Sequence, residues 1–385
     1  MSRTLELLDS LIAFPTVSAD TNLPLIDWAQ DLLSACGARV HRMHDETGLK
    51  AGLYAEIGPD SPGGVVLSAH SDVVPVAGQN WTRPPFRLTR EDDRVFGRGT
   101  TDMKGFVACM LAAAERASRG KLAEPLKLSL SWDEEVGCIG VHKMLPDLKA
   151  RIGAPRLCIV GEPTGMQAAI GHKGKAAIRA DCTGENGHSA MAPHFVNALH
   201  LACDFVAGLR AMQNDLAANG ARDEAYDPPC TTVHAGRMNG GRALNIVPDS
   251  ATVDFEFRHI AADAADALHA RLRALADTVA ERYRPRFADA RIDFSPIFDY
   301  PGLDTPANSE AVRFVQSVSG VDGVTKVAYG TEGGYFAGTL GIPTVVCGPG
   351  SMTEQGHKPD ESIGIGELDA CDTMLDRLIG AMSRS

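Results

Sequence analysis

The stretch Gly64-Val65-Val66-Leu67-Ser68-Ala69-His70-Ser71-Asp72 decides the fold class of this chain of 385 residues. Its apolar first half predicts a buried strand, and the histidine and the aspartate come where that strand ends. Open α/β sheets gather their functional groups at the carboxyl ends of their strands. Acidic and imidazole groups at the ends of other apolar runs should therefore meet His70.

Further candidates of this kind follow along the chain, each after a hydrophobic run or a glycine-rich turn. They are Asp102, the pair Glu134-Glu135, Glu162 and His357. Taken singly, each is better explained as a hydrogen-bonded cap than as a metal ligand. Together, two imidazoles and several carboxylates offer what two divalent cations sharing a bridging carboxylate need. The set therefore favours a two-metal hydrolase.

Local spacing suggests a division of roles among these residues. Asp72 lies two positions after His70, so its carboxylate can accept the second imidazole N–H and need not be a ligand itself. Neighbouring side chains at the end of a strand point to opposite sides. One of Glu134 and Glu135 can therefore bind metal while the other faces the substrate as a base. In isolation, this acidic run is better explained as a solvated turn.

A series of short runs carries a resemblance that covers almost the whole chain. In order, they are SAHSDVVP, GRGTTDMKG, SWDEEVG, CIVGEPT, HKGK, NGHSAMAP, YGTEGGYF and GPGSMTEQGHKPDE. They resemble the zinc metallohydrolase family that includes acetylornithine deacetylase, succinyl-diaminopimelate desuccinylase, carboxypeptidase G and aminoacylase. Within it, CIVGEPT with HKGK, and GTEGGYF with GPGS and HKPDE, are most similar to the acetylornithine deacetylases.

The resemblance implies a role for each candidate, and every position is matched. Two zinc ions per subunit are implied, although cobalt or manganese can occupy such ligands. The implied roles are His70 and Glu162 on one zinc, Glu135 and His357 on the other, Asp102 bridging both, Glu134 as general acid/base and Asp72 as the partner of His70. A cis peptide bond after Asp102 is also implied. The departures, Gly356 and Asn186-Gly187, lie in the substrate region.

Length and pattern predict two domains, because 385 residues are too many for one ordinary core. We expect an α/β fold, a mixed-sheet zinc-exopeptidase-like catalytic domain at residues 1–172 and 285–385. Its predicted strands include 51–57, 64–69, 126–132 and 157–160. From about Lys173 the pattern changes to strands at 175–182, 230–236 and 250–257 and helices at 195–213 and 262–283. This segment, 173–284, reads as an inserted α+β lid or dimerisation domain.

The resemblance also implies contacts outside the metal ligands. His188, in a polar turn of the lid, would cross a homodimer interface to hydrogen-bond the carbonyl oxygen in the partner's active site. Asn245 and Arg258 would contact the substrate, although Arg258 could equally form a surface salt bridge. Thr331 and Gly333 would form a substrate-facing loop, for which a simple turn is the alternative.

Composition narrows the classes of partner and the location. The net charge of −12 argues against nucleic acid and anionic membranes. Nine scattered cysteines without C-x-x-C spacing are typical of reduced, cytosolic proteins. The first residues carry acids where a secretory segment needs an apolar block, and no run reaches the roughly 18 apolar residues of a membrane span. We expect a cytoplasmic enzyme.

The predicted reaction is metal-dependent hydrolysis of the amide bond of an N-acyl amino acid. By resemblance, the favoured substrate is N-acetyl-L-ornithine, giving L-ornithine and acetate in arginine biosynthesis. The alternatives are succinyl-diaminopimelate desuccinylase, another N-acyl-amino-acid hydrolase or a dipeptidase. Outside enzymes, a silent metal-binding homologue is possible in principle, but such a protein would be expected to lack the base, and Glu134 is present.

Overall fold

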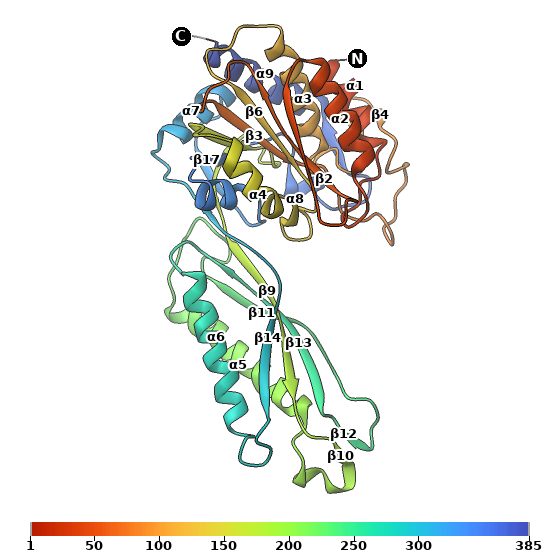
Figure 1. Ribbon diagram of the computed structural model, residues 1–385, viewed down its shortest axis with the longest axis vertical. Helices are drawn as coiled ribbons and strands as arrows, with labels where there is room; N and C mark the ends of the chain where they lie inside the picture. The colour runs from red at the N-terminus through yellow and green to blue at the C-terminus, as the bar shows by residue number, and fades with distance from the viewer. Residues whose placement is uncertain (1, 384–385) are drawn as a thin grey trace. The chain divides into compact units, whose positions relative to one another are not determined.

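The computed structural model of the protein describes residues 2–383, and these divide into two compact units. Unit 1 contains the described residues up to Gly171, Leu303–Val327 and those from Thr331 on. Unit 2 contains His172–Gly302 and Ala328–Gly330. Figure 1 shows the elements of both units as a ribbon.

A mixed sheet of nine strands forms the centre of unit 1. Its strands are β1 (Arg39–His44), β2 (Ala51–Ile57), β3 (Val65–His70), β6 (Leu126–Ser131), β7 (Leu157–Val160), β8 (Ala168–His172), β15 (Leu303–Asp304), β16 (Val324–Val327) and β17 (Thr344–Val346). The order is β1-β2-β6-β3-β7-β17-β8-β15, with β16 beside β8. Strand β3 runs parallel to both β6 and β7, and β17 runs parallel to β7. These parallel strands bring their carboxyl ends to one edge.

A smaller sheet and the helices complete unit 1. The smaller sheet consists of β4 (Thr89–Glu91), β5 (Arg94–Phe96) and β18 (Ser362–Gly364). The helices are α1 (Arg3–Ile12), α2 (Leu23–Ala35), α3 (Lys104–Ser118), α4 (Ile139–Arg151), α7 (Glu310–Ser319), α8 (Met352–Gln355) and α9 (Ile365–Met382), with a π-helical turn η2 (Tyr335–Thr339).

The core of unit 1 follows from strand alternation. Leu67 and Ala69 of β3 point into one apolar cluster shared with α1, α2, α3, α7 and α9. On β2, Leu53 points into the same cluster, so its neighbour Gly52 points to the other face. A Cβ on Gly52 would lie 2.5 Å from Sδ of Met144 in α4. Helix α4 therefore covers that face of the sheet, where only glycine leaves it room.

Unit 2 is a four-stranded antiparallel sheet covered by two long helices. Its strands are β11 (Thr232–Gly240), β13 (Ser250–His259), β9 (Gly174–Thr183) and β14 (Arg291–Tyr300), in that order. The helices are α5 (Ala198–Asn219) and α6 (Ala265–Glu281), which lie along the same side of the strands in Figure 1. A two-stranded sheet of β10 (Gly187–His188) and β12 (Ile246–Val247) and the 3-10 helix η1 (Ser189–His194) complete it.

Alternation also explains the two faces of this sheet. Ile178 and Ala180 of β9 pack with Phe205 of α5 in one apolar cluster. Between them, Arg179 points to the other face, where Asp254 of β13 accepts its Nε hydrogen bond at 2.7 Å. One face of the sheet is therefore apolar and covered by helices, and the other is polar.

The predicted α/β fold with a mixed sheet is confirmed. The chain returns to unit 1 at Leu303, later than the predicted residue 285. The difference arises because β14 pairs with β9 along Arg291–Tyr300 and so completes the sheet of unit 2. In the described residues, no helix is long and apolar enough to cross a membrane.

Candidate metal centre

Three predicted ligands meet at the carboxyl ends of the parallel strands in unit 1. Nε2 of His70, the last residue of β3, lies 3.2 Å from Oδ1 of Asp102 and 3.4 Å from Oε1 of Glu162. All three side chains are buried, and one ligand atom of each falls within 4.8 Å of the others. We call them the His70 group.

A second set shares Asp102 with the first. Nε2 of His357 lies 3.2 Å from Oδ2 of Asp102 and 3.0 Å from Oε2 of Glu135. Asp102 therefore offers one carboxylate oxygen to each set, which is the arrangement of a bridging ligand. The side chain of His357 is 51% exposed, so this second set, the His357 group, is the one that opens to solvent.

Asp72 connects His70 to the acidic turn after β6. Nδ1 of His70 lies 3.0 Å from the backbone oxygen of Asp72 and 3.4 Å from Oδ1 of its carboxylate. The carboxylate also accepts the backbone N–H groups of Glu134 at 3.1 Å and Glu135 at 3.3 Å, and the hydroxyl of Ser18 at 2.7 Å. Asp72 thus orients the imidazole and the turn together, as a supporting group does in metal sites.

The turn that carries Glu134 is held from both sides. Asp133 adopts a left-handed conformation with φ of 51°, which is unusual for a residue other than glycine. Its carboxylate accepts the N–H of Ala19 at 2.9 Å and pairs with the buried Lys50. Glu134 is buried, and its Oε1 accepts a hydrogen bond from Sγ of Cys138 at 3.3 Å. The carboxylate of Glu134 interacts electrostatically with Glu162, His70 and Glu135, and it belongs to neither ligand group.

Gly161 explains how Glu162 reaches its position after β7. A Cβ at residue 161 would lie 1.9 Å from Cδ1 of Phe106 in α3. Only glycine allows this close approach between the strand end and the helix. The run CIVGEPT therefore places its glutamate by way of the glycine before it.

Two buried glutamates near the centre were not predicted to have a role. Glu361 accepts the backbone N–H groups of Thr101 at 2.8 Å and Asp102 at 3.0 Å. The bond between Asp102 and Met103 is cis, as the resemblance implied. Glu332 accepts hydrogen bonds from Ser131 and, at 2.9 Å, from Ser68 of β3. Both glutamates lie in quoted motifs, HKPDE and GTEGGYF, and a charged residue within a motif was the available signal.

Burial and mutual repulsion raise the pKa of most carboxyl groups in the centre. Burial, then the charge of Glu162, raises the pKa of Glu134 well above its usual range. Burial and the charge of Asp102 raise the pKa of Glu135 to about 8 and that of Glu162 to about 7. Among the ligand carboxylates Asp102 is the exception, because hydrogen bonds from the two histidines outweigh burial and lower its pKa.

The pKa values of both histidines are raised, so that both imidazoles hold protons. Hydrogen bonds to Asp102 and Glu135 raise the pKa of His357 to about 10. Burial alone would lower the pKa of His70, but hydrogen bonds to Asp102, Asp72 and Glu162 raise it well above its ordinary value. Protons therefore supply the positive charge that this cluster of acids requires.

The donor set fits divalent cations. Imidazole nitrogen with carboxylate oxygen is the ligand chemistry of zinc and related ions, and a cation would replace those protons. Oε1 of Glu135 is a buried carboxylate oxygen for which the described residues provide no hydrogen-bond partner. A buried polar oxygen without a partner is costly, and a cation bound at that oxygen would remove the cost. The residues therefore fit two cations bridged by Asp102.

The residues that were predicted to contact the substrate are divided between unit 1 and unit 2. Thr331 and Gly333 are buried in unit 1, and the Thr331 hydroxyl accepts the N–H of Gly333 at 3.0 Å. They lie in an internal turn, and their contact with the substrate stays a prediction. In unit 2, Nε of Arg258 donates a hydrogen bond to Glu256 at 3.0 Å. This is the salt bridge that was predicted from the sequence as the alternative to a substrate contact.

His188 and Asn245 lie near one another in unit 2. His188 is exposed in β10, and its Nδ1 accepts the N–H of Ala190 at 3.1 Å. The exposed Asn245 precedes β12, and its backbone oxygen accepts the N–H of Ser189 at 3.0 Å. Both side chains are available to a further molecule.

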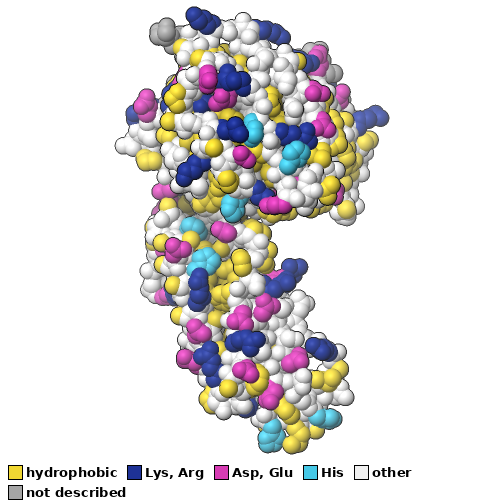
Figure 2. Space-filling model, in the orientation of Figure 1, with side chains coloured by type: hydrophobic (Ala, Val, Ile, Leu, Met, Phe, Trp, Pro, Cys, Tyr) yellow, Lys and Arg dark blue, Asp and Glu magenta, His cyan; other side chains and the backbone are white. Residues whose placement is uncertain are grey.

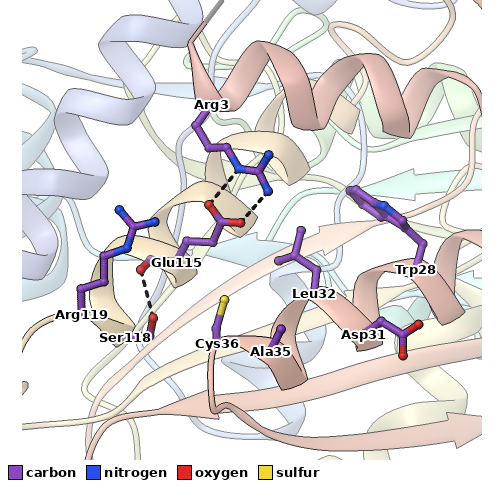
Figure 3. Close-up of a pocket in the computed structure, with 9 residues that line it drawn as sticks. All are labelled: Arg3, Trp28, Asp31, Leu32, Ala35, Cys36, Glu115, Ser118 and Arg119. Atoms are coloured by element: carbon purple, nitrogen blue, oxygen red, sulfur yellow. Dashed lines mark hydrogen bonds and ion pairs between the residues drawn. The ribbon is translucent and has the colours of Figure 1, made fainter.

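A hollow of about 620 Å³ lies between α1, α2 and α3 on unit 1. Figure 3 shows Trp28 and Leu32 on one side of it and the pair Arg3–Glu115, joined by a 2.9 Å hydrogen bond, across it. It contains none of the metal-ligand candidates, and this ion pair is satisfied internally. The hollow therefore adds nothing to the chemistry of the centre.

Comparison with known proteins gives consistent results. The sequence profile of Peptidase family M20/M25/M40 matches residues 66–381. A protein of Myxococcus xanthus named acetylornithine deacetylase is 34% identical over 386 aligned positions, covering 97% of this chain and 95% of that protein. The fold is similar to an M20 family metallo-carboxypeptidase from Sulfolobus solfataricus, with a TM-score of 0.76, 19% identity and coverage of 98% and 99% of the two chains. It is also similar to a dinuclear metal-binding M20 peptidase of Bacillus subtilis, with a TM-score of 0.67, 18% identity and coverage of 99% and 98%.

Proposed function

Since the chain belongs to Peptidase family M20/M25/M40, we propose that it hydrolyses the amide bond of N-acyl amino acids, with N-acetyl-L-ornithine as the favoured substrate. The observation that carries the proposal is the pair of ligand groups sharing Asp102, with the buried carboxylate of Glu134 beside them. A scaffold or silent homologue would have no use for that additional acid.

In this proposal, His70 and Glu162 would hold one divalent cation, Glu135 and His357 would hold the other, and Asp102 would hold both. When bound, the cations would supply Lewis acidity, which lowers the pKa of water toward neutrality and polarises an amide carbonyl. Zinc is the favoured metal because the ligands are imidazole and carboxylate, although cobalt or manganese suits them too.

Glu134 moves the proton. Its carboxylate accepts a proton from the attacking water and returns it to the nitrogen of the leaving amine, which is the work of a general acid/base. Burial raises the pKa of Glu134 in the metal-free protein, which makes its ionised carboxylate a stronger base. Asp72 holds the turn of Glu134 by its backbone, so that the base stays at a constant position. A carboxylate and a free amino acid leave as products.

The proposal includes a homodimer formed through unit 2, in which His188 hydrogen-bonds the substrate carbonyl in the partner's site. Figure 2 shows hydrophobic and histidine side chains together at the end of unit 2 that carries β10 and β12 in Figure 1. Leu244 is 101% exposed there, and Met191 and Ile246 are exposed as well. Apolar side chains exposed in this way suit burial against another protein surface.

Strand β11 is the better edge for pairing between two copies. It lies at one edge of its sheet and is exposed from Gly236 to Gly240. The opposite edge strand, β14, contains Pro296, which has no N–H to donate to a neighbouring strand. An open edge is satisfied when it pairs with its own copy around a two-fold axis.

A substrate panel tests the assignment. Metal-loaded protein should hydrolyse N-acetyl-L-ornithine with a higher kcat/KM than N-succinyl-diaminopimelate or a β-alanyl dipeptide. The support is the 34% identity to a protein named acetylornithine deacetylase. A preference for either competitor by more than about tenfold, which corresponds to about 1.4 kcal/mol of transition-state binding, would reject the substrate and leave the chemistry in place.

Metal content tests the chemistry itself. The protein should bind two divalent ions per subunit and lose activity when a chelator removes them. Full activity in a preparation that contains no transition metal would reject the two-metal centre.

A further inference from the structure

The backbone conformation of the segment that carries His357 is unfavourable by itself. His357 and Asp360 both adopt left-handed conformations, with φ of 60° and 53°. Such conformations are disfavoured for residues other than glycine and persist only where the surroundings impose them. Between α8 and β18, neither residue lies in a helix or a strand. Contacts from elsewhere must therefore hold this ligand in place.

Side chains and backbone of the segment 79–83 supply part of that hold. Nε2 of Gln79 donates a hydrogen bond to the backbone oxygen of His357 at 2.9 Å. Nε1 of Trp81 donates to Oε1 of the same Gln79 at 3.0 Å, which turns the amide so that its N–H faces His357. The carboxylate of Asp360 accepts the backbone N–H of Thr82 at 3.0 Å.

Glu361 holds the other irregular ligand segment, the turn that leads to Asp102. Its Oε1 accepts the N–H groups of Thr101 at 2.8 Å and Asp102 at 3.0 Å. Its Oε2 accepts the N–H of Gly99 at 2.9 Å. One fully buried carboxylate thus accepts three backbone N–H groups of the same turn. These three hydrogen bonds fix the backbone that carries the bridging ligand.

Arg98 connects the contacts that position His357 with those that position the turn of Asp102. Its Nη1 donates to Oε2 of Glu361 at 2.7 Å and to the backbone oxygen of Lys358 at 3.2 Å. Its Nη2 donates to Oε1 of Gln79, and its guanidinium lies 4.9 Å from the ring centre of Trp81. The planar guanidinium can make these contacts at the same time, which a lysine ammonium on a single stem cannot reproduce.

We propose that Arg98, Glu361 and Gln79 form a positioning clamp that holds Asp102 and His357 at the separation required by two bridged cations. The inference rests on the proposed metal centre. The hydrogen bonds of Gln79 and Glu361 to the ligand residues go to backbone atoms, so these residues act through the backbone of the ligands. His70 is the last residue of β3 and Glu162 comes two residues after the end of β7, and the clamp does not hold either of them.

Substitutions can separate the two arms of the clamp. In Glu361→Gln, one oxygen becomes an NH₂ group that faces N–H donors, so the turn of Asp102 loses part of its hold. Because Asp102 serves both cations, both binding steps should weaken by about 10- to 100-fold, the usual effect of removing such a support. Gln79→Leu removes the contact to the backbone of His357 and the acceptor that Trp81 and Arg98 share, but it leaves the bonds from the turn of Asp102 to Glu361 in place. It should weaken only the step of the His357 group, by about tenfold.

Stepwise calorimetric titration of the metal-free chain with zinc measures both affinities, and His357→Ala identifies which step belongs to its group. The matched control is Lys127→Gln, which removes another buried cation of unit 1 that donates to the backbone oxygen of Ile152 at 2.6 Å. It should lower the unfolding temperature and leave both affinities unchanged. A clamp that only stabilised the fold would behave like this control.

The outcomes separate the inference from the function on which it rests. If the wild type binds no pair of cations, both fail. If the wild type binds two and Glu361→Gln binds them with unchanged affinity, the clamp is wrong and the metal centre stands. Equal weakening of both steps by Gln79→Leu also overturns the clamp, since Gln79 bonds the backbone of His357 and not that of Asp102. Should Glu361→Gln not fold, the selective effect of Gln79→Leu, at a partly exposed residue, decides.

Discussion

Glu332 offers a test of how the centre behaves without metal. Burial raises the pKa of its carboxyl group from 4.5 to about 7. The folded state therefore binds this proton more tightly than the unfolded state does. The stability that the proton on Glu332 contributes is greatest below pH 4.5. It declines between pH 4.5 and 7 and is constant above that range.

The size of the effect follows from the shift. Each pKa unit corresponds to 1.36 kcal/mol, so the ionised Glu332 should cost the metal-free fold about 3 kcal/mol above pH 7. Glu332→Gln replaces the charge with a neutral group of the same shape. The hydroxyls of Ser68 and Ser131 can rotate to serve an amide as well as a carboxylate. The variant should therefore be more stable than the wild type at pH 8, and nearly equal to it at pH 4.5.

Urea unfolding of the chelated proteins at a series of pH values measures this difference. Glu56→Gln is a control of opposite sign, because hydrogen bonds from Tyr54 and Arg39 outweigh burial and lower the pKa of Glu56. Its variant should lose stability above pH 4.5. If Glu332→Gln is no more stable than the wild type at pH 8 while the control behaves as expected, Glu332 is not a buried charge that destabilises the fold.

Further predictions concern turnover, metal and assembly. Glu134→Gln should keep both cations and lower kcat by about two to four orders of magnitude; near wild-type turnover would mean another base. Since hydrogen bonds raise the pKa of His357 to about 10, chelated protein should lose stability as the pH rises from 6.5 toward 10, and unfolding temperatures that stay constant would contradict this. Gly161→Ala should displace Glu162 and cost about 1–3 kcal/mol, visible as lower metal content and a lower unfolding temperature. Mixing His188→Ala with Glu134→Gln subunits should restore about a quarter of wild-type activity, because half the dimers are mixed and each has one whole site; no recovery despite proven exchange would place His188 outside the partner's site.

The regular elements around the centre could be predicted from the sequence because their patterns are local. The predicted strands at 51–57, 126–132 and 157–160 appear as β2, β6 and β7, with ends that agree to within a residue. The expected meeting of His70 with Glu162 is also found, because β3 and β7 are parallel neighbours. Strand polarity was enough to bring their ends together.

Strand β14 shows where local pattern was insufficient. Its residues Arg291–Tyr300 were assigned to the returning catalytic domain, but they complete the sheet of unit 2. Pairing with a strand more than a hundred positions earlier leaves no mark on the local sequence of either. The boundary therefore depends on which partner buries the strand, and that is a tertiary choice.

By itself, the sequence determined the metal-ligand chemistry and the strands that carry most of it, because residue type and apolar periodicity are properties of short segments. Only the tertiary structure decided how Asp102 and His357, on irregular turns, come to face one another. It did so through the buried pair Arg98–Glu361, whose members are 263 positions apart and 2.7 Å from each other. The energy of this ion pair depends on its burial and on how many N–H donors its few acceptors bind at the same time. No single segment of the sequence contains that information.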